Sequence, residues 1–234
     1  MSPKKKTSTP KPLLLAEELT KTYGDLDALA PLDLRIDRGE RVVLVGHNGS
    51  GKSTFLRMVA GVLEPTDGTV RIGDADAGSL EARARTSYLP DEPVLYDDLS
   101  VREHVDYLGR LHGTEGFDDE AERVAERLGI LHRIDDLPAR FSRGLRQKTA
   151  LLLGLCRPFE LVLIDEPFVG LDLAGKAALV DVLAERHADG ATLVVATHDP
   201  AYAADVDRCI ALHDGEVTYD GPAAEADIPA LVSA

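Results

Sequence analysis

The most informative segment of the chain is Gly46-His47-Asn48-Gly49-Ser50-Gly51-Lys52-Ser53-Thr54, which fits the pattern G-x-x-x-x-G-K-[ST]. Residues 41–45 before it form a β-branched run typical of a buried parallel strand, and residues 55–60 after it favour a helix. A glycine-rich turn in this place lets backbone N–H groups and the helix N-terminus surround phosphates. Lys52 can reach the β- and γ-phosphates, and the Ser53 hydroxyl can bind Mg²⁺. The segment therefore predicts a nucleoside triphosphate site.

Two carboxylates follow another apolar run further along the chain. Residues 161–164 read Leu-Val-Leu-Ile and are followed by Asp165 and Glu166. Such a run is typical of a fully buried strand that brings acids to the carboxyl edge of a parallel sheet, where the glycine-rich loop also lies. Asp165 is placed to hold Mg²⁺ directly or through water, and Glu166 to orient and deprotonate an attacking water. Each segment alone also fits a blander structure, a chance turn or a core strand that ends in a loop. Together they favour nucleotide chemistry.

Length and charge limit the class of protein. With 234 residues, 44% of them hydrophobic, the chain can bury one substantial core, and we expect one unit with two lobes. The 41 acidic residues outnumber the 26 basic ones, which argues against nucleic-acid binding because phosphate contacts need clustered positive charge. The basic run Lys4-Lys5-Lys6 lies in a Pro/Ser/Thr-rich stretch, and we predict a disordered leader over residues 1–12.

Cysteine usage and hydropathy favour a cytosolic protein. Cys156 and Cys209 are too few and too isolated for a disulfide framework or a zinc site, so we expect them to be reduced and buried. Only four apolar residues, 13–16, follow the lysines, which is too short for a secretion signal. The apolar segment 150–156 is far shorter than the ~20 residues that span a bilayer. We expect any work at a membrane to require a partner.

The order of the expected elements indicates an α/β protein. Alternating patterns over residues 13–44 suit half-buried strands, and Asp67-Gly68 is a hairpin-type turn signal, so we expect an antiparallel layer near the amino end. Residues 97–156 have a helical pattern that begins with a Ser100 cap three residues before Glu103. Strands then alternate with a helix, as in βαβ units, at 161–164, 174–187 (the helix), 192–196 and 209–212. The helical stretch is thus expected to be an insert between two halves of one sheet.

Four further motifs are distributed along the chain. They are Lys21-Thr22-Tyr23-Gly24, Phe141-Ser142-Arg143-Gly144-Leu145-Arg146-Gln147, Gly170-Leu171-Asp172 and Thr197-His198-Asp199. With the two segments above, this ordered set resembles the nucleotide-binding subunit of ATP-binding-cassette (ABC) transporters from about Leu13 to Gly221. The second motif resembles the family signature, usually Leu-Ser-Gly-Gly-Gln, which separates ABC ATPases from kinases and GTPases.

The resemblance implies a role for each motif. Ser142 and Gly144, at a helix start, form a second anion site that faces the γ-phosphate bound by another cassette, so that two cassettes pack head to tail around two ATP molecules. His198 contacts the γ-phosphate and helps to hold the water that Glu166 activates. Asp172 belongs to the nucleotide-contacting D-loop. Tyr23 falls where the family places an adenine-stacking aromatic, although by itself it fits core packing equally well.

Two departures from the family pattern bear on the site. The signature has Arg143 and Leu145 in place of Gly and Gln, and this Ser-x-Gly-x-x-Gln form resembles that of ATPases in the ABC-2 type exporter subfamily. Residues 88–93 resemble the Q-loop, but Asp91 stands at the glutamine position, so an acceptor-only carboxylate replaces an amide. We expect Asp91 to approach Mg²⁺, directly or through water, and the residues after it, 96–99, to contact a membrane partner. The other histidines, including His104, His112 and His132, show no metal-ligand spacing and are interpreted as surface or packing residues.

The resemblance implies an α/β P-loop NTPase (RecA-like) core with an antiparallel β layer and an inserted α-helical subdomain. We expect one ABC ATPase domain over residues 13–234, divided into a nucleotide-binding core (13–90 and 157–220), a helical signature subdomain (91–156) and a C-terminal tail (221–234). The implied catalytic groups are Lys52, Glu166 and His198, the implied ligands are ATP and Mg²⁺, and Ser53, Asp165 and Asp91 are the candidate metal ligands.

The implied function is ATP hydrolysis that energises a separate transmembrane permease, with export favoured over import. The chain would pair with a second cassette, identical or a sibling, and lie in the cytoplasm at the inner face of the cell membrane. The alternative is a soluble ABC ATPase acting on DNA or ribosomes, which the acidity, the single cassette and the short span from Gly46 to Ser142 without heptads all disfavour. An inactive scaffold that binds ATP as a structural ligand is also disfavoured, because the residues needed for hydrolysis are intact: Lys52, Asp165, Glu166 and His198.

Overall fold

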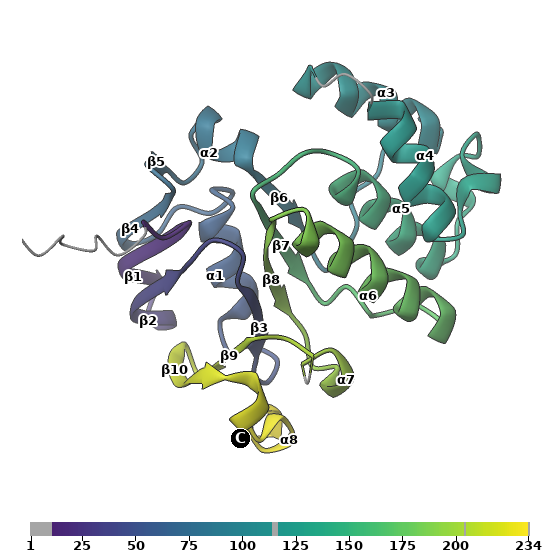
Figure 1. Ribbon diagram of the computed structural model, residues 1–234. Coiled ribbons are helices and arrows are strands. Elements are labelled where there is room, and N and C mark those ends of the chain that lie inside the picture. Colours follow the sequence, from purple (N-terminus) through teal and green to yellow (C-terminus); the bar gives the residue numbers. More distant parts are fainter. Residues whose placement is uncertain (1–10, 114–116, 204, 234) are drawn as a thin grey trace, which may run out of the picture.

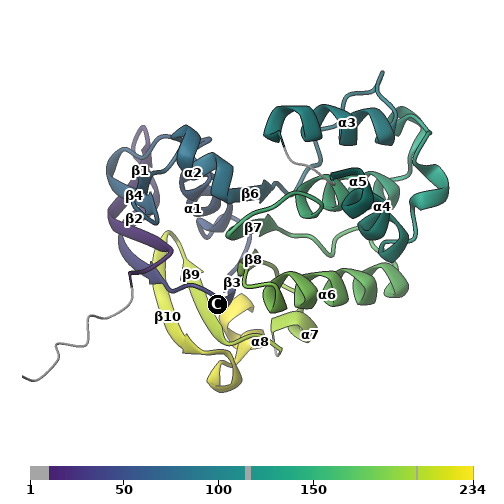
Figure 2. The same cartoon turned by 45° about the horizontal axis from the view of Figure 1, so that its top comes forward.

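Two β-sheets and several helices make up the structure, a computed structural model that describes residues 11–113, 117–203 and 205–233 (Figure 1). One sheet is antiparallel and the other is mostly parallel. Helices α3 (Val101–His112), α4 (Phe117–Arg127) and α5 (Arg143–Leu155) gather on the side away from the antiparallel sheet in both views (Figures 1 and 2). Residues 1–10 of the predicted leader, including Lys4-Lys5-Lys6, lie outside the described residues.

The antiparallel sheet has the strand order β2-β1-β4-β5. Its strands are β1 (Leu14–Tyr23), β2 (Leu26–Ile36), β4 (Asp67–Ile72) and β5 (Ala75–Asp76). Over residues 32–36 of β2 the apolar side chains are buried, while the polar ones between them are exposed or half-buried. This is the alternation expected when one face of a sheet packs on a core and the other meets solvent. The predicted antiparallel layer near the amino end is confirmed.

The hairpin predicted at Asp67-Gly68 is wrong. Both residues belong to β4, where Asp67 pairs with Thr20 of β1. The register of β1 shifts between Glu17 and Thr20, and a side-chain carbon on Gly68 would lie only 2.2 Å from the Glu18 carbonyl oxygen. The glycine is therefore required because two backbones approach closely at a bulge. A bulge and a turn can both require glycine at this position, so the dipeptide alone does not distinguish them.

The second sheet has the strand order β10-β9-β3-β8-β7-β6, and every neighbouring pair is parallel except β9 and β10. Its strands are β3 (Arg41–Val45), β6 (Thr86–Leu89), β7 (Leu161–Asp165), β8 (Thr192–Ala196), β9 (Arg208–His213) and β10 (Glu216–Pro222). All residues of β7 and β8 are buried, because layers of structure cover both faces of the sheet. The strands predicted at 41–45, 161–164, 192–196 and 209–212 are confirmed.

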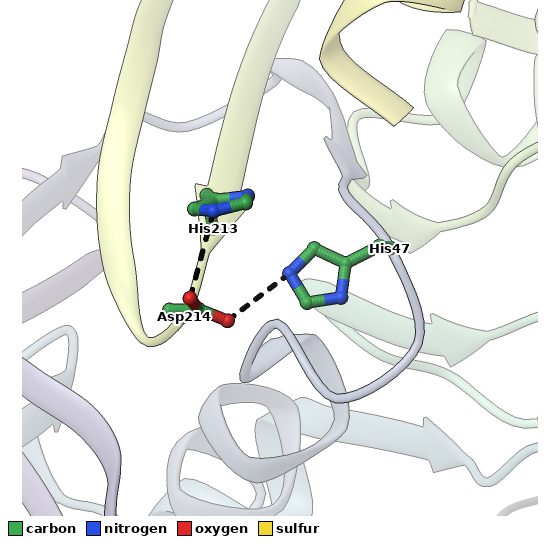
Figure 3. A group of neighbouring side chains, drawn as sticks. All are labelled: His47, His213 and Asp214. Atoms are coloured by element: carbon green, nitrogen blue, oxygen red, sulfur yellow. Dashed lines mark ion pairs between the residues drawn. The ribbon is translucent and has the colours of Figure 1, made fainter. Parts of the chain in front are cut away.

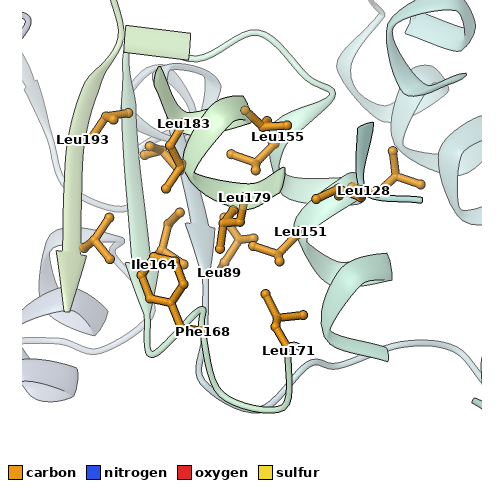
Figure 4. Packing of buried hydrophobic residues seen from close by; sticks show 14 of the residues in the cluster. Leu89, Leu128, Leu151, Leu155, Ile164, Phe168, Leu171, Leu179, Leu183 and Leu193 are labelled. Carbon is orange, nitrogen blue, oxygen red and sulfur yellow. The ribbon is translucent and has the colours of Figure 1, made fainter. Parts of the chain in front are cut away.

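Alternate residues of the parallel strands pack into two separate hydrophobic clusters. Val42 and Leu44 of β3 join the cluster between the two sheets, which also contains Phe55 and Leu56 of α1 (Lys52–Val59). The opposite face of the sheet packs against the helices, including α5 and α6 (Leu173–Ala188), as Figure 4 shows for part of this cluster. Packing on both faces therefore fixes the parallel strands, and the polar loops follow directly at the ends of these strands.

The N-terminus of α3 is capped as the sequence predicts. Ser100 Oγ accepts the Glu103 N–H, and a Glu103 carboxylate oxygen accepts the Ser100 N–H at 2.7 Å, which forms a capping box. The short elements are α2 (Leu80–Arg85), η1 (Leu131–Arg133), η2 (Pro138–Arg140), α7 (Pro200–Ala203), η3 (Ala223–Glu225) and α8 (Ile228–Ser233). In the described part of the chain, no helix combines the length and apolar character needed to cross a membrane.

Candidate functional site

The glycine-rich loop connects β3 to α1 in a conformation that its glycines make possible. Gly46, Gly49 and Gly51 have φ values of +144°, +90° and +104°. At Gly46, a side-chain carbon would also lie 2.1 Å from the Leu212 carbonyl oxygen. No side chain caps the N-terminus of α1, so its first N–H groups remain directed at the space in front of the loop. That arrangement is suited to an anion.

Lys52 lies at the centre of this loop. Its side chain is 7% exposed, and its ammonium group donates to the Gly46 carbonyl at 2.7 Å and the His47 carbonyl at 3.0 Å. Burial lowers the pKa of Lys52, while the nearby Glu166 and Asp165 carboxylates act in the opposite direction. The cation is therefore held in place by carbonyl groups before any ligand binds.

Asp165 ends β7 with a carboxylate that is almost fully buried, at 2% exposure. Burial raises its pKa most, the charges of Asp91 and Glu166 add to this, and the hydrogen bond from Ser53 and the charge of Lys52 oppose it. One of its oxygens, Oδ2, has no hydrogen-bond partner among the described residues. A buried carboxylate oxygen without a partner, beside a hydroxyl, is a suitable pair of ligands for Mg²⁺, which prefers oxygen donors.

Glu166 follows directly and has a strained backbone. Its φ of +47° lies in the left-handed region, which side chains other than glycine rarely adopt. The Glu166 N–H donates to the Ala196 carbonyl at 2.8 Å, so the residue is tied to the end of the neighbouring strand β8. Strain of this kind is maintained by surrounding structure and is typical of functional sites. In Glu166, this backbone conformation directs the carboxylate toward the edge of the sheet where the glycine-rich loop lies.

His198 lies on the loop after β8, beside Glu166. Its Nδ1 is 3.0 Å from Glu166 Oε2, and its side chain is 61% exposed. The Thr197 N–H donates to the Leu44 carbonyl at 3.1 Å, and Lys176 donates to Asp199 at 2.7 Å. The Lys176 hydrogen bond holds the pKa of Asp199 below its usual value. The imidazole is thus exposed on a loop that is fixed at both sides.

One cleft brings most of the predicted nucleotide-binding residues together. It is lined by Asn48, Gly49, Ser50, Gly51, Lys52, Ser53, Thr54, Asp91, Asp165 and Glu166. Glu166 also lines a neighbouring hollow that contains His198 and the loop from Phe168 to Leu171. Gly46 and His47 do not line the cleft, but their carbonyl groups hold Lys52. The cleft therefore combines a cation, free backbone donors and three carboxylates.

Ser142, Gly144 and Asp172 lie at helix starts outside this cleft. Ser142 caps α5 by accepting the Leu145 N–H, and Asp172 caps α6 by accepting the Gly175 N–H at 2.8 Å. Gly144 allows close contact with the chain after β7, because a side-chain carbon there would lie 2.6 Å from the Gly170 carbonyl oxygen. Each of the three residues therefore has a structural role within the chain.

Tyr23, at the end of β1, also lies apart from the cleft lining. Its side chain is half exposed, and the Lys21 ammonium lies 5.1 Å from the centre of its ring. An exposed aromatic face is available for stacking. Among the other histidines, His104 is a packing residue as predicted, because it is buried and its Nε2 accepts the Tyr96 N–H at 3.0 Å.

Two contacts at the site were not predicted from the sequence. Lys176 fixes the loop that carries His198, and its position four residues into a helix gave no signal for this role. The turn between β9 and β10 supports the glycine-rich loop, since the Gly215 N–H donates to the Ser50 carbonyl at 3.1 Å. The dipeptide Asp214-Gly215 between two strand-like runs was a usable signal for that turn.

Comparison with known proteins identifies the family. A sequence model described as "ABC transporter" matches residues 29–169. The chain belongs to the ABC transporter family. The SkfA peptide export ATP-binding protein SkfE of Bacillus subtilis is 32% identical over 89% of this chain and 88% of that protein. The macrolide export ATP-binding/permease protein MacB 1 of Aeromonas hydrophila is 33% identical over 89% of this chain but only 34% of its own length.

A solved structure supports the same assignment. The ATP-binding cassette MJ0796, solved as a dimer in a post-hydrolysis state with ADP and Pi, superimposes with a TM-score of 0.83 at 27% identity, over 91% of this chain and all of that chain. The predicted P-loop NTPase fold and the resemblance to ABC ATP-binding subunits are confirmed. The chain is an ABC ATPase. The alternative of an ATPase acting on DNA or ribosomes finds no support among these relatives.

Proposed function

We propose that this ABC ATPase hydrolyses Mg²⁺-bound ATP in the cleft and thereby energises a membrane permease carried on a separate chain, in the direction of export. The observation that supports this most is the convergence of Lys52, Asp165 and Glu166 on one cleft at the carboxyl edge of the parallel sheet. Export is favoured because the relatives SkfE and MacB 1 are named as export proteins and because the signature has the Ser-x-Gly-x-x-Gln form.

Phosphate binding is the task of the glycine-rich loop. The free N–H groups at the start of α1 donate to the β- and γ-phosphate oxygens, and the Lys52 ammonium exchanges its carbonyl partners, Gly46 and His47, for these oxygens. Ser53 and Asp165, with Asp91 at the rim, would hold Mg²⁺. The metal would neutralise charge on the β- and γ-phosphates. Tyr23 supplies an exposed ring for the adenine.

Glu166 is the general base in this proposal. Its carboxylate accepts a proton from a water whose oxygen attacks the γ-phosphorus, the bond from that phosphorus to the β-phosphate oxygen breaks, and ADP and phosphate result. The Nδ1 of His198 lies 3.0 Å from Glu166 Oε2, and in its doubly protonated form the ring donates one N–H to this carboxylate, which it orients, and the other to the γ-phosphate. Lys52 stabilises the negative charge that develops on the transferred group.

A second cassette, either another copy of this chain or a sibling, completes the site. Ser142 and the start of α5 form an anion-binding helix end that does not line the cleft of their own chain. Head-to-tail packing would place them on the γ-phosphate held by the other cassette, with Asp172 near the same interface. The dimeric form of the similar cassette MJ0796 supports this arrangement.

The permease would contact a groove beside the cleft, which places the protein at the inner face of the cell membrane. One loop connects the two places: Asp91 lines the nucleotide cleft, whereas Val94 and Tyr96 line a groove that also includes Tyr107 of α3. Val94 is 89% exposed, Tyr96 57% and Tyr107 49%, so an apolar surface is open to a partner. A shift of Asp91 on nucleotide binding would be transmitted along this loop to the groove.

Co-purification tests the proposal. Tagged Glu166→Gln protein is expressed in the native host, ATP and Mg²⁺ are added, and membranes are solubilised gently before capture, because this variant should hold ATP without turnover. We expect a multi-span membrane protein to co-purify, and the matched variant Glu166→Gln/Val94→Asp, altered in the groove, to lose it. Recovery of ribosomes, DNA or soluble protein alone would contradict the transport role.

A further inference from the structure

Three side chains come together on the side of the glycine-rich loop that faces the β9–β10 turn. They are His47 of the loop, His213 at the end of β9 and Asp214 in the turn, drawn in Figure 3. The His47 Nε2 lies 3.3 Å from Asp214 Oδ1, and the His213 Nε2 lies 3.6 Å from Asp214 Oδ2. One potential ligand atom from each residue lies within 4.8 Å of the others. The ATPase steps proposed above use none of these three side chains.

The fold holds the three residues in fixed positions. Asp214 and Gly215 form a two-residue turn in which both have positive φ, +47° and +82°, as a type I′ hairpin requires. The turn is seated on the loop by the hydrogen bond from the Gly215 N–H to the Ser50 carbonyl at 3.1 Å. The parallel pairing of β3 with β9 brings the loop and the turn to the same edge of the sheet.

The hydrogen bonds of His47 leave a lone pair facing the carboxylate. Its Nδ1 lies 2.8 Å from the Asn48 carbonyl oxygen, which can only accept, so Nδ1 carries the proton. In the neutral ring, Nε2 is then an acceptor, and it is buried with no hydrogen-bond partner among the described residues. It faces Asp214, another acceptor. A cation between these two acceptors would be stabilised by both of them.

We propose that His47, His213 and Asp214 bind a divalent transition metal ion of the zinc class. Zinc bonds to imidazole nitrogen and carboxylate oxygen are about 2.0–2.2 Å long, so two ligands on one tetrahedral ion are about 3.3–3.5 Å apart. The 3.3 Å between His47 Nε2 and Asp214 Oδ1 matches this spacing without movement. His213 reaches the same ion by a side-chain adjustment on the order of 1 Å, and water takes the fourth position.

The donor set and its surroundings select this class of ion. Two imidazoles with one carboxylate suit Zn²⁺, Ni²⁺ or Cu²⁺, whereas Mg²⁺ and Ca²⁺ prefer oxygen ligands. The Nδ1–H bond from His47 to a backbone carbonyl is the contact that orients metal-ligating histidines in proteins. His47 and His213 are about one third exposed and Asp214 is mostly exposed, so an ion can enter from solvent.

The bound ion would cross-link the glycine-rich loop and the β9–β10 turn. The three ligands come from two segments that are distant in the sequence, so the site exists only in the folded chain and metal binding stabilises the fold. The site is separate from the Mg²⁺ ligands Ser53 and Asp165, which lie in the nucleotide cleft. A metal here would therefore regulate the mobility of the loop that holds the phosphates.

Titration of Zn²⁺ into the full-length, tag-free protein without nucleotide tests the proposal. We expect one tight site by calorimetry and a matching rise in melting temperature. His213→Ala and Asp214→Asn should each weaken binding at least tenfold and remove the thermal effect, and Asn keeps the turn because it tolerates positive φ. His132→Ala, which removes an exposed histidine elsewhere, should leave the titration unchanged.

Two results would overturn the proposal. Absence of a Zn²⁺ site at micromolar concentrations would mean that the three side chains do not form a metal site. Equal Zn²⁺ affinity in the wild type, His213→Ala and Asp214→Asn would place the metal on other residues. Circular dichroism of both variants separates loss of the ligand from loss of the fold, and their ATPase rates in metal-chelated buffer with Mg²⁺ added back should equal that of the wild type.

Discussion

Gly144→Ala tests the close contact between the start of α5, which Ser142 caps, and the chain at Gly170. A Cβ at Gly144 would lie 2.6 Å from the Gly170 carbonyl oxygen, a backbone atom that cannot rotate away. The start of α5 or the chain at Gly170 must therefore move by several tenths of an ångström. Overpacking of this kind costs about 1–3 kcal/mol, and the better helix propensity of alanine offsets about 0.5–1 kcal/mol of it. With the middle of both ranges, we expect a net loss on the order of 1 kcal/mol in the free energy of unfolding.

Activity should suffer more than stability, because Ser142 is displaced from the nucleotide of the proposed partner cassette. A misplacement of ~1 Å can cost about 10²-fold in rate, so a shift of a few tenths predicts a loss of about tenfold in kcat. Urea unfolding and steady-state ATPase assays measure the two effects. Gly109→Ala in α3 is the matched control: the atoms nearest to its Cβ would belong to the Phe117 side chain, at 3.4–3.6 Å, so this variant should gain about 0.5–1 kcal/mol and keep full activity. Equal urea midpoints and equal rates for Gly144→Ala and the wild type would refute the reasoning.

Three further predictions concern Asp165, the two cysteines and Tyr23. Burial raises the pKa of Asp165 in the folded protein, so keeping this carboxyl ionised lowers the free energy of unfolding at pH 7. This loss disappears below pH 3.8, the ordinary pKa of an aspartate, because the carboxyl is then protonated in both the folded and the unfolded protein. Asp165→Asn should therefore melt higher than the wild type at pH 7 without Mg²⁺ and nucleotide, while it loses hydrolysis; a lower melting temperature would contradict this. Burial raises the pKa of Cys156 to about 12 and that of Cys209 to about 11, so neither thiol should react with a maleimide at pH 7 until urea unfolds the chain, and rapid labelling of native protein would be the opposite result. Tyr23→Ala should weaken ATP binding about tenfold by loss of stacking and Tyr23→Phe should not, in a fluorescent-nucleotide titration; equal affinities for both variants would remove Tyr23 from the site.

The parallel strands and the loops that follow them were predictable from the sequence. Residues 161–164 and 192–196 are continuous apolar runs because both faces of their strands are covered, and this burial leaves a pattern that sequence alone reveals. The cleft was predictable for a related reason: polar residues placed directly after such strands meet at one edge. The roles of Asp91, Ser142 and Asp172 stay predictions, since their proposed ligands are the metal and a nucleotide held by another cassette.

Features that depend on contacts between distant segments could not be predicted. The dipeptide Asp67-Gly68 has the sequence of a turn. Its glycine is needed instead because the backbone of β4 passes close to a bulge in β1, and this contact depends on how the two strands pair. His47 was interpreted as one position of the phosphate loop, and its approach to His213 and Asp214 depends on the pairing of β3 with β9. Local patterns therefore indicated the elements and the order of the motifs, and the register between strands determined the contacts around them.

The ATPase rate of Glu166→Gln, measured beside its affinity for ATP, tests the central claim most directly. The amide keeps the shape of the side chain and cannot accept the proton of the attacking water. We predict that kcat falls by about 10²–10⁴-fold, the usual contribution of a general base, while the protein still folds and binds ATP as tightly as the wild type. Full turnover by Glu166→Gln would contradict the assignment of Glu166 and, with it, the proposed chemistry of the cleft.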